Sequence, residues 1–265
     1  MKIAIIGAGN MGGALARGLA QGSIIATSDI YVSNPSTAKL DALKNEYHEI
    51  NVTRDNRVAT AEADMVVIAV KPWKVVEVLE EIKPYIDYTR QSVASMVGGL
   101  GLEQLGKWLD KGDGVLPATY LIIPNTAIAT MSSMTFITSA RSTEAQDRLL
   151  VDIFNELGEA MLVDEGLIAA GTSLASCGIA YALRYIRAAM EGGVELGFRA
   201  DDAKRIVMQT LRGAADILAA NGSHPEAEID RVTTPGGLTI KGLNAMEAAG
   251  FTNSVIEGLR TSTKR

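Results

Sequence analysis

The 265-residue sequence has one cysteine and two histidines, and this scarcity limits the chemistry open to the protein. A single cysteine, Cys177, excludes a disulfide bond within the chain and is typical of the reducing cytoplasm. The two histidines, His48 and His224, stand far apart with no metal-ligand spacing around them. We therefore expect a cytoplasmic protein with no metal site.

Aromatic residues and positive charge are also sparse: aromatic residues make up 5% of the chain, and its formal net charge is -6. Such a chain offers few rings for stacking on bases and repels phosphates and anionic lipids, so we expect neither nucleic acid nor a membrane as a partner. No apolar run reaches the roughly 20 residues of a membrane span, because Pro117, Pro124 and Asn125 interrupt the best candidate. The expected partner is a small molecule.

The first half of the chain alternates strand patterns with helix patterns. Short runs rich in β-branched residues predict strands at residues 2–6, 30–32, 65–70, 92–97 and 135–138. Amphipathic segments such as 11–21 and 73–82 lie between them. Because strands that alternate with helices form a parallel sheet between two helical layers, we predict an α/β fold. Its N-terminal domain, residues 1–163, is expected to be a doubly wound Rossmann domain with a mainly parallel sheet.

The strand patterns stop after Val163, and helical periodicity takes over. Apolar residues then recur at steps of three and four, as in Leu183, Ile186, Met190 and Val194. These patterns predict an all-helical domain over residues 164–265. A domain this small and this apolar completes its core by pairing with a second copy, so we expect at least a homodimer.

The segment "GAGNMG" follows the first strand and opens a helix. In that context Gly7 permits a tight turn, Gly9 lets a pyrophosphate approach the backbone, and Gly12 lets helix and strand pack closely. The N-terminus of the helix adds free N–H groups and a partial positive charge. This loop predicts dinucleotide binding; the alternative is a glycine-rich turn without a ligand.

The second strand continues into "YVSNPST" and carries no acidic residue where an NAD site would place one for the ribose hydroxyls. Ser33, Asn34 and Ser36 donate hydrogen bonds without repelling a 2′-phosphate, which favours NADP. No arginine or lysine follows at once, the nearest being Lys39. A helix start capped by Ser36 or Thr37 is the alternative interpretation, and the two roles can coexist.

Two further strands end in segments that carry polar residues. "AVKP" places Lys71 and Pro72 where a cofactor crevice would open; the alternative is a proline that ends a strand before a helix. "PNTA" places Asn125 and Thr126 in an apolar setting, where they either satisfy backbone groups in a turn or contact a ligand.

The segment "TPGGLT" near the end of the chain offers only backbone amides and hydroxyls. Gly236 and Gly237 lead into a helix that is expected to begin near Leu238, so unpaired N–H groups and a helix dipole converge on one point. Such a point can receive a carboxylate. A plain turn with Thr234 or Thr239 as a helix cap explains the segment equally well.

Together "GAGNMG", "AVKP", "PNT" and "TPGGLT" resemble the motifs of the pyrroline-5-carboxylate reductase family, and the likeness covers nearly the whole chain. The resemblance implies reduction of L-1-pyrroline-5-carboxylate to L-proline, with NADPH as the preferred donor and NADH left open. It also implies a Rossmann domain followed by a helical domain for dimerisation and substrate binding. Relatives often form larger rings of dimers, so we leave that assembly open.

The resemblance assigns residues to the two ligands. The residues implied to bind the cofactor are Gly7, Gly9, Asn10, Met11, Gly12, Ser33, Asn34, Asn56, Ala69, Val70, Lys71, Pro72, Asn125 and Thr126. The residues implied to bind the substrate are Thr234, Gly236, Gly237, Leu238 and Thr239. Amides and a hydroxyl of that late loop would receive the substrate carboxylate. Thr239, as the catalytic residue, would hydrogen-bond the ring nitrogen.

The sequence departs from the family pattern in two places. "LIIPNTA" has Leu121, Ile123 and Ala127 where the family usually has arginine, methionine and proline, and "ASCGIAY" replaces a Ser-Gly-Ser-Gly-Pro-Ala-Tyr segment. These changes leave open a divergent substrate preference, a slow paralogue, or a non-catalytic NADP-binding regulator. A separate alternative is a β-hydroxyacid dehydrogenase with Lys241 as its base. Lys241 lies on roughly the opposite helix face from Thr239, which favours a solvated surface role.

Overall fold

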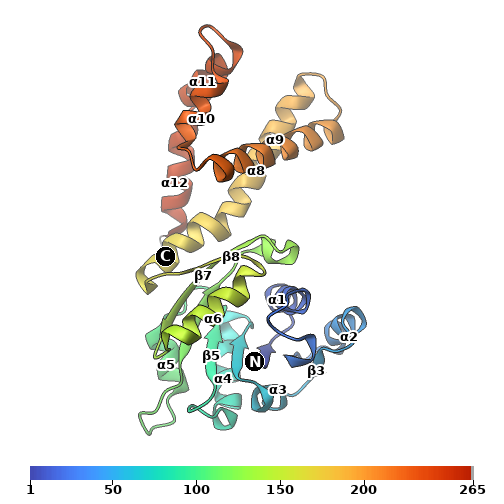
Figure 1. Ribbon diagram of the computed structural model, residues 1–265, viewed down its shortest axis with the longest axis vertical. Helices are drawn as coiled ribbons and strands as arrows, with labels where there is room; N and C mark the ends of the chain where they lie inside the picture. Colours follow the sequence, from blue (N-terminus) through green and yellow to red (C-terminus); the bar gives the residue numbers. More distant parts are fainter. Residues whose placement is uncertain (264–265) are drawn as a thin grey trace. The chain divides into compact units, whose positions relative to one another are not determined.

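The computed structural model describes residues 1–263 and consists of two compact units, Met1–Ser176 and a second that begins at Cys177 (Figure 1). The first unit contains the sheet, and the second, as far as residue 263, is helical. The domain boundary between residues 163 and 164 stays a prediction.

A sheet of eight strands forms the centre of the first unit, in the order β3-β2-β1-β4-β5-β6-β7-β8. The strands are β1 (Ile3–Ile6), β2 (Ile30–Ser33), β3 (Asn51–Thr53), β4 (Met65–Ile68), β5 (Ser92–Ser95), β6 (Thr119–Ile123), β7 (Ser133–Ala140) and β8 (Gly158–Leu162). Neighbouring strands are parallel, except that β6 and β7 are antiparallel. The predicted fold class, with its mainly parallel Rossmann sheet, is therefore confirmed.

The sequence patterns do not predict strands β3 and β8. β3 has three residues, all of them partly exposed. β8 lies at the edge of the sheet, and its Met161 and Leu162 side chains are 45% and 47% exposed. Neither strand has the continuous apolar run or the strict alternation that marks a strand in a sequence.

Helices cover both faces of the sheet. They are α1 (Asn10–Gln21), α2 (Thr37–Glu46), α3 (Asn56–Glu62), α4 (Val75–Ile82), α5 (Leu102–Leu109), α6 (Glu144–Asn155) and the short α7 (Ile168–Gly171). Successive residues of β1 point to opposite faces: Ile3 and Ile5 join a core with α1, α2 and α6, whereas Ala4 and Ile6 join one with α3, α4 and α5. The sheet is thus buried on both sides, as a parallel sheet requires.

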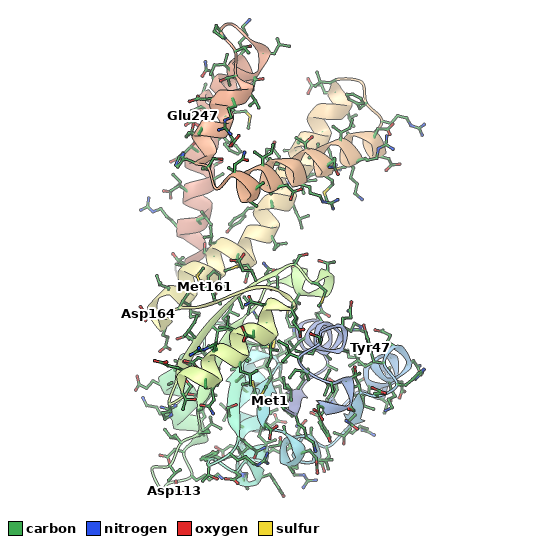
Figure 2. The ribbon with its side chains drawn as sticks, viewed as in Figure 1. Met1, Tyr47, Asp113, Met161, Asp164 and Glu247 are labelled. Atoms are coloured by element: carbon green, nitrogen blue, oxygen red, sulfur yellow. The ribbon has the colours of Figure 1, made fainter. Side chains whose placement is uncertain are left out.

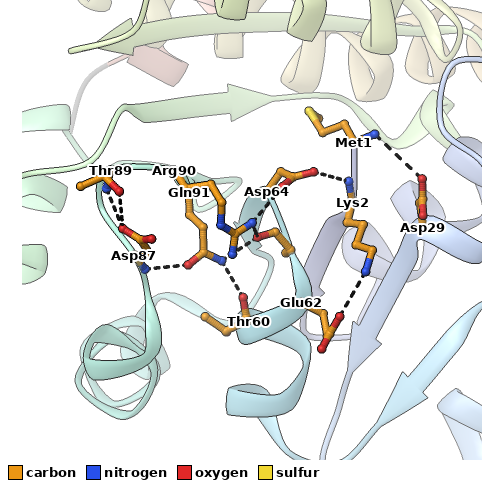
Figure 3. Close-up of polar contacts among 11 residues, drawn as sticks. Met1, Lys2, Asp29, Thr60, Glu62, Asp64, Asp87, Thr89, Arg90 and Gln91 are labelled. Atoms are coloured by element: carbon orange, nitrogen blue, oxygen red, sulfur yellow. Dashed lines mark hydrogen bonds and ion pairs between the residues drawn. The ribbon is translucent and has the colours of Figure 1, made fainter.

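Polar contacts tie the strands together at their amino ends (Figure 3). The Lys2 backbone N–H donates to Asp64 Oδ2 at 2.8 Å, and Arg90 Nη1 donates to Asp64 Oδ1 at 2.9 Å. The Gln91 side-chain amide donates to the Thr60 carbonyl at 2.7 Å. Because Lys2, Asp64 and Gln91 directly precede β1, β4 and β5, this network lies at the edge opposite to the predicted cofactor loops.

The second unit begins with a helical hairpin (Figure 1). Its helices are α8 (Gly178–Glu195), α9 (Ala200–Asn221), α10 (Pro225–Val232), α11 (Leu238–Ala248) and α12 (Phe251–Thr263). Helices α8 and α9 approach closely, since a Cβ atom on Gly193 would lie 3.0 Å from the Ala203 Cβ. Helix α12 contacts α8, where the Tyr181 hydroxyl donates to the Gly258 carbonyl at 3.2 Å.

Within residues 178–263, the helices of the second unit bury one residue, Ala203. Large apolar side chains stay exposed, including Leu183 at 58% and Leu196 at 83%. Figure 2 shows the side chains of these helices projecting on all sides. A single copy of this unit therefore has too little core to account for its own stability.

The segment Glu165–Glu195 is long and apolar enough to cross a membrane, judged by length and composition alone. The expectation that no segment reaches this length is therefore wrong. In the single chain, 17% of its most apolar window is buried. Exposed apolar helix faces of this kind also fit a second protein surface, as the predicted homodimer requires.

Candidate functional site

The carboxyl ends of the central strands meet at one edge of the sheet. Ile6 at the end of β1 is in register with Ser33 of β2 and with Ile68 of β4. Ser33 is in turn in register with Thr53 of β3. The loops that follow these strands therefore lie side by side, at the point where the strand order reverses. This is where open α/β sheets bind their ligands.

The glycine loop has the geometry that its sequence predicts. Gly7 has a φ of +109°, and a Cβ atom there would lie 2.7 Å from the Ala69 carbonyl oxygen. A Cβ atom on Gly12 would lie 1.9 Å from the Gly7 carbonyl oxygen and 2.9 Å from the Ala69 Cβ. A Cβ atom on Gly9, by contrast, would meet nothing within 4 Å. The backbone beside Gly9 is therefore open to a ligand.

Helix α1 begins at Asn10, and its N-cap residue Gly9 offers no side-chain cap. The first N–H groups of a helix have no partner within the helix. Here the N–H groups of Asn10, Met11 and Gly12 form that first turn, at the positive end of the helix dipole. This arrangement fits a pyrophosphate group.

The polar side chains at the end of β2 form a connected set. The buried Ser33 hydroxyl donates to Asn56 Oδ1 at 2.6 Å, and Asn56 Nδ2 donates to Glu81 Oε2 at 2.8 Å. Asn34 Oδ1 accepts from the Ala8 N–H at 3.1 Å, so Asn34 also holds the glycine loop. The structure thus brings Ser33, Asn34 and Asn56 together. Asn34's contact with the loop was not predicted, because its partner lies 26 residues away.

Ser36 occupies the N-cap position of α2, but its side chain makes no capping hydrogen bond. The Asn34 side-chain amide instead donates to the Ser36 carbonyl at 3.2 Å. The prediction that Ser36 caps the next helix therefore holds for its position, although the side-chain hydrogen bond of a cap is absent.

The "AVKP" segment follows β4 and contacts the glycine loop. The Ala69 N–H donates to the Ile6 carbonyl at 2.9 Å, and Val70 is half-buried next to Gly7. Lys71 is exposed, and Pro72 begins a 3-10 turn, Pro72–Lys74. The proline does end the extended segment, and the segment also lies at the predicted cofactor edge.

Asn125 follows β6 and acts as a local cap. Its Oδ1 atom accepts from the Ala127 N–H at 2.9 Å, and its own N–H donates to the Ser133 hydroxyl at 3.1 Å. Asn125 is 5% exposed, whereas Thr126 is exposed. The turn interpretation of "PNTA" therefore holds for Asn125, and Thr126 is the side chain that faces solvent.

A π-helix at Thr172–Cys177 packs against this turn, and no sequence pattern predicted it. The Ser176 hydroxyl donates to the Pro124 carbonyl at 3.3 Å, and Asn125 Nδ2 approaches the Ala175 carbonyl at 3.5 Å. π-Helices are rare and often occur at functional sites. Ala175 and Ser176, the first two residues of "ASCGIAY", therefore lie next to the "PNTA" turn.

The late loop lies in the second unit and precedes helix α11. Gly236 has a φ of +72°, and Gly237 is the N-cap of α11 without a side-chain cap. The Gly237 N–H donates to the Thr234 carbonyl at 2.9 Å, which corrects the expectation that this amide is free. The turn at Pro235 and Gly236 folds the chain back and produces that bond.

The N–H groups of Leu238 and Thr239, in the first turn of α11, have no partner within the helix. Leu238 is 87% exposed, and Thr239 is exposed as well. Lys241 is exposed and forms no ion pair or hydrogen bond with the part of the chain that the structure describes. The N-terminus of α11 thus presents first-turn amides and a helix dipole, with no acidic side chain in its first turn.

The charge of Asp55, near the predicted cofactor edge of the sheet, is neutralised by an arginine of the same chain. Hydrogen bonds from the Arg57 guanidinium, at 2.8 and 2.7 Å, lower the pKa of Asp55 to about 2. Among residues 1–263, no group of three or more His, Cys, Asp and Glu residues is arranged to hold a metal ion.

Two family models match the sequence. One is described as NADP oxidoreductase, coenzyme F420-dependent, and matches residues 2–96. The other is described as pyrroline-5-carboxylate reductase dimerisation and matches residues 165–265. The two matches cover the glycine loop and the helical second unit respectively.

The chain is similar over its whole length to characterised proteins. It is 38% identical to pyrroline-5-carboxylate reductase 1 of Dictyostelium discoideum, over 99% of this chain and 49% of that protein, so it spans about half that relative's length. It is 36% identical to pyrroline-5-carboxylate reductase 2 of the same organism, over 100% of this chain and 91% of that protein.

Among solved structures, the fold is similar to Plasmodium falciparum pyrroline carboxylate reductase with NADP bound. The TM-score is 0.87 and the sequence identity 25%, with 99% of this chain and 95% of that chain covered. The likeness therefore extends over both units of the chain.

Proposed function

The chain belongs to the pyrroline-5-carboxylate reductase family, and from this premise we propose that it reduces L-1-pyrroline-5-carboxylate to L-proline with NADPH. The observation that carries this proposal is the 36% identity to a named reductase across 100% of the chain. The glycine loop supports it, because the backbone at Gly9 is open and Gly12 cannot carry a side chain.

The first unit would hold the cofactor at the carboxyl edge of its sheet. The N–H groups of Asn10, Met11 and Gly12 would bind the pyrophosphate. The polar side chains at the end of β2 would face the adenosine end of the cofactor. The "AVKP" segment would line the cofactor groove, and Asn125 and Thr126 would lie by the nicotinamide. NADPH supplies the hydride when it is bound. NADH as a second donor stays a prediction.

Helix α11 would bind the substrate carboxylate. Its first-turn amides at Leu238 and Thr239, with the Gly236 N–H and the Thr234 hydroxyl, are the donors proposed here. The amide of Gly237 contributes to the turn instead, since it already donates to Thr234. A carboxylate at this point is stabilised by the helix dipole.

Thr239 would orient the ring nitrogen of the substrate. A protonated cyclic imine accepts a hydride without a strong acid beside it, so positioning carries most of the rate. A hydroxyl on α11 can orient the nitrogen and relay a proton from solvent. The late loop would then need no titratable residue between Val232 and Ile240.

The assembly and location proposed here follow the same evidence of family and composition. A homodimer would cover the apolar faces that one copy of the second unit leaves exposed. Whether the dimers assemble into a larger ring is an open question, which a measurement of the mass in solution answers. The single cysteine supports a cytoplasmic location.

Steady-state kinetics of two variants test the role of α11. We expect Thr239→Ala to lower kcat with pyrroline-5-carboxylate roughly 10-fold to 100-fold, because an interaction made in the transition state is lost. Lys241→Ala is the matched control on the same helix, and we expect it to leave the rate and its pH profile unchanged.

The reverse pattern would favour a β-hydroxyacid dehydrogenase: Lys241→Ala inactive, Thr239→Ala unaffected, and a rate that depends on the lysine's titration. NADPH binding without turnover of pyrroline-5-carboxylate would favour the non-catalytic regulator. The observation that favours testing the regulator is the departure from the family pattern at Leu121, Ile123 and Ala127.

A further inference from the structure

The end of β2 supplies neutral donors only, although a 2′-phosphate is an anion. Ser33 and Asn34 are both engaged in hydrogen bonds within the chain, and the Glu81 carboxylate lies 2.8 Å from Asn56 Nδ2. A carboxylate so close would repel a phosphate unless a cation balances it. A cation beside this loop would offset that charge, and the segment 33–36 contains none.

Strand β3 brings a cation to this position. Thr53, the last residue of β3, is in register with Ser33, and its carbonyl accepts from the Asn34 N–H at 3.2 Å. Arg54 is the next residue, so its backbone lies beside Asn34 at the carboxyl edge. Arg54 and Asn34 are twenty positions apart in the sequence. The sequence of the loop after β2 therefore does not predict a positive charge at this position.

Arg54 is also available to a ligand. Its side chain is exposed and forms no hydrogen bond or ion pair with residues 1–263. The nearby arginine, Arg57, is committed instead: it binds Asp55 through two hydrogen bonds and lies 5.9 Å from the centre of the Tyr85 ring. Asp55 is neutralised by this pairing, so Arg54 keeps its positive charge uncompensated.

We propose that Arg54 binds the 2′-phosphate of NADPH and thereby selects NADPH over NADH. The proposal rests on the proposed function for the identity of the cofactor. A guanidinium group presents paired N–H donors that match phosphate oxygens, and such charge-assisted bonds are stronger than those from the neutral side chains at β2. The neutral donors would then fix the ribose, and Arg54 would recognise the phosphate.

Direct binding to the full-length protein tests this without any turnover. Isothermal titration calorimetry would compare NADPH, NADH and adenosine 2′,5′-bisphosphate for the wild type and Arg54→Gln. We expect Arg54→Gln to weaken NADPH and the bisphosphate roughly 10-fold to 100-fold, as the loss of charge-assisted bonds implies. Affinity for NADH should stay within about twofold, which also shows that the variant is folded.

Lys39→Gln is the matched control, because Lys39 is an exposed cation on the neighbouring helix α2. We expect it to change all three affinities by less than about twofold. Arg54→Lys keeps the charge without the paired donors, and it should fall between the wild type and Arg54→Gln.

The proposal is overturned if Arg54→Gln weakens NADPH and NADH equally, if it changes neither, or if Lys39→Gln weakens NADPH as much. Absence of bisphosphate binding to the wild type would overturn it as well. Because these affinities do not depend on pyrroline-5-carboxylate, a wrong substrate would leave them intact. Conversely, if Arg54→Gln still reduces pyrroline-5-carboxylate but no longer prefers NADPH over NADH, the proposed reaction is unaffected.

Discussion

The glycines of the first loop differ in what a side chain at each would meet. Gly12 has no room, since a Cβ atom there would lie 1.9 Å from the Gly7 carbonyl oxygen. Gly9 has room and an ordinary φ of -71°. The packing of α1 on the sheet therefore requires glycine at position 12 and not at position 9, where the proposed pyrophosphate contact would require it.

Alanine at these two positions should separate folding from binding. We expect Gly12→Ala to destabilise the protein by at least about 2 kcal/mol, because a backbone atom must move. Gly9→Ala should keep the wild-type melting temperature and bind NADPH roughly tenfold or more weakly. Thermal denaturation and fluorescence titration would measure the two effects. Equal losses of stability in both variants would contradict the assignment of Gly9 to the ligand.

A residue's role could be predicted from the sequence where it depends on neighbouring positions in the chain. It could not be predicted where it depends on contacts made in the folded structure. Gly7 and Gly12 were predictable because a strand, a turn and a helix follow one another in a single short segment. Asn34 was not, since the Ala8 N–H that it accepts from is contributed by another loop. The engaged amide of Gly237 was not predictable either, because it depends on how the turn at Gly236 folds.

At the scale of elements, the helices and buried strands were predictable and the edges were not. The pattern at residues 11–21 corresponds to α1, Asn10–Gln21, because its apolar face is strongly periodic. β8 escaped prediction because an edge strand is exposed on one side. The π-helix at Thr172–Cys177 escaped it because its register depends on contacts with the turn at Pro124 and Asn125.

Glu156 joins two such elements: the end of α6 and the segment after α1. It accepts from the Ser23 N–H at 2.7 Å, the Ser23 hydroxyl at 2.5 Å and the Ile24 N–H at 3.1 Å. Burial raises the pKa of Glu156, but these hydrogen bonds outweigh it, so the pKa lies below its ordinary value of 4.5. The folded state therefore favours the carboxylate form.

This contact predicts a pH-dependent loss of stability. A lowered pKa in the folded state contributes stability above the unfolded value and loses it as the pH falls through the folded value. We expect Glu156→Gln to cost about 1 kcal/mol at pH 7, a modest figure because the site is partly solvated. The difference from the wild type should begin to shrink as the pH falls below the ordinary value of 4.5 and should disappear once the pH is below the lower folded pKa. Urea denaturation at several pH values measures it, and a difference that is constant with pH would contradict this account.

At the scale of the whole molecule, the second unit requires a partner surface. Leu183 of α8, and Leu196 and Phe198 of the connection between α8 and α9, are at least half exposed in one copy. The family model that matches residues 165–265 is described as a dimerisation domain. The exposed apolar faces and the family match therefore lead to the same assembly.

A charge on the exposed face of α8 should break this assembly. We expect Leu183→Asp to convert the dimer to a monomer or to insoluble protein, because a carboxylate would be buried in an apolar interface. Val115→Asp, at an apolar residue 49% exposed in the first unit, is the matched control and should leave the mass unchanged. Light scattering after size-exclusion chromatography measures the mass. A monomeric wild type would refute the predicted interface.

The central claim is that neutral donors of one helix hold an imine acid for reduction by a cofactor on the Rossmann edge. Transfer of deuterium from NADPH labelled at C4 of the nicotinamide to pyrroline-5-carboxylate tests it most directly. We predict that L-proline forms with one deuterium at the former imine carbon when the transferred face is labelled. Oxidation of NADPH without labelled proline, or no reaction at all in a protein that binds NADPH, would contradict the claim.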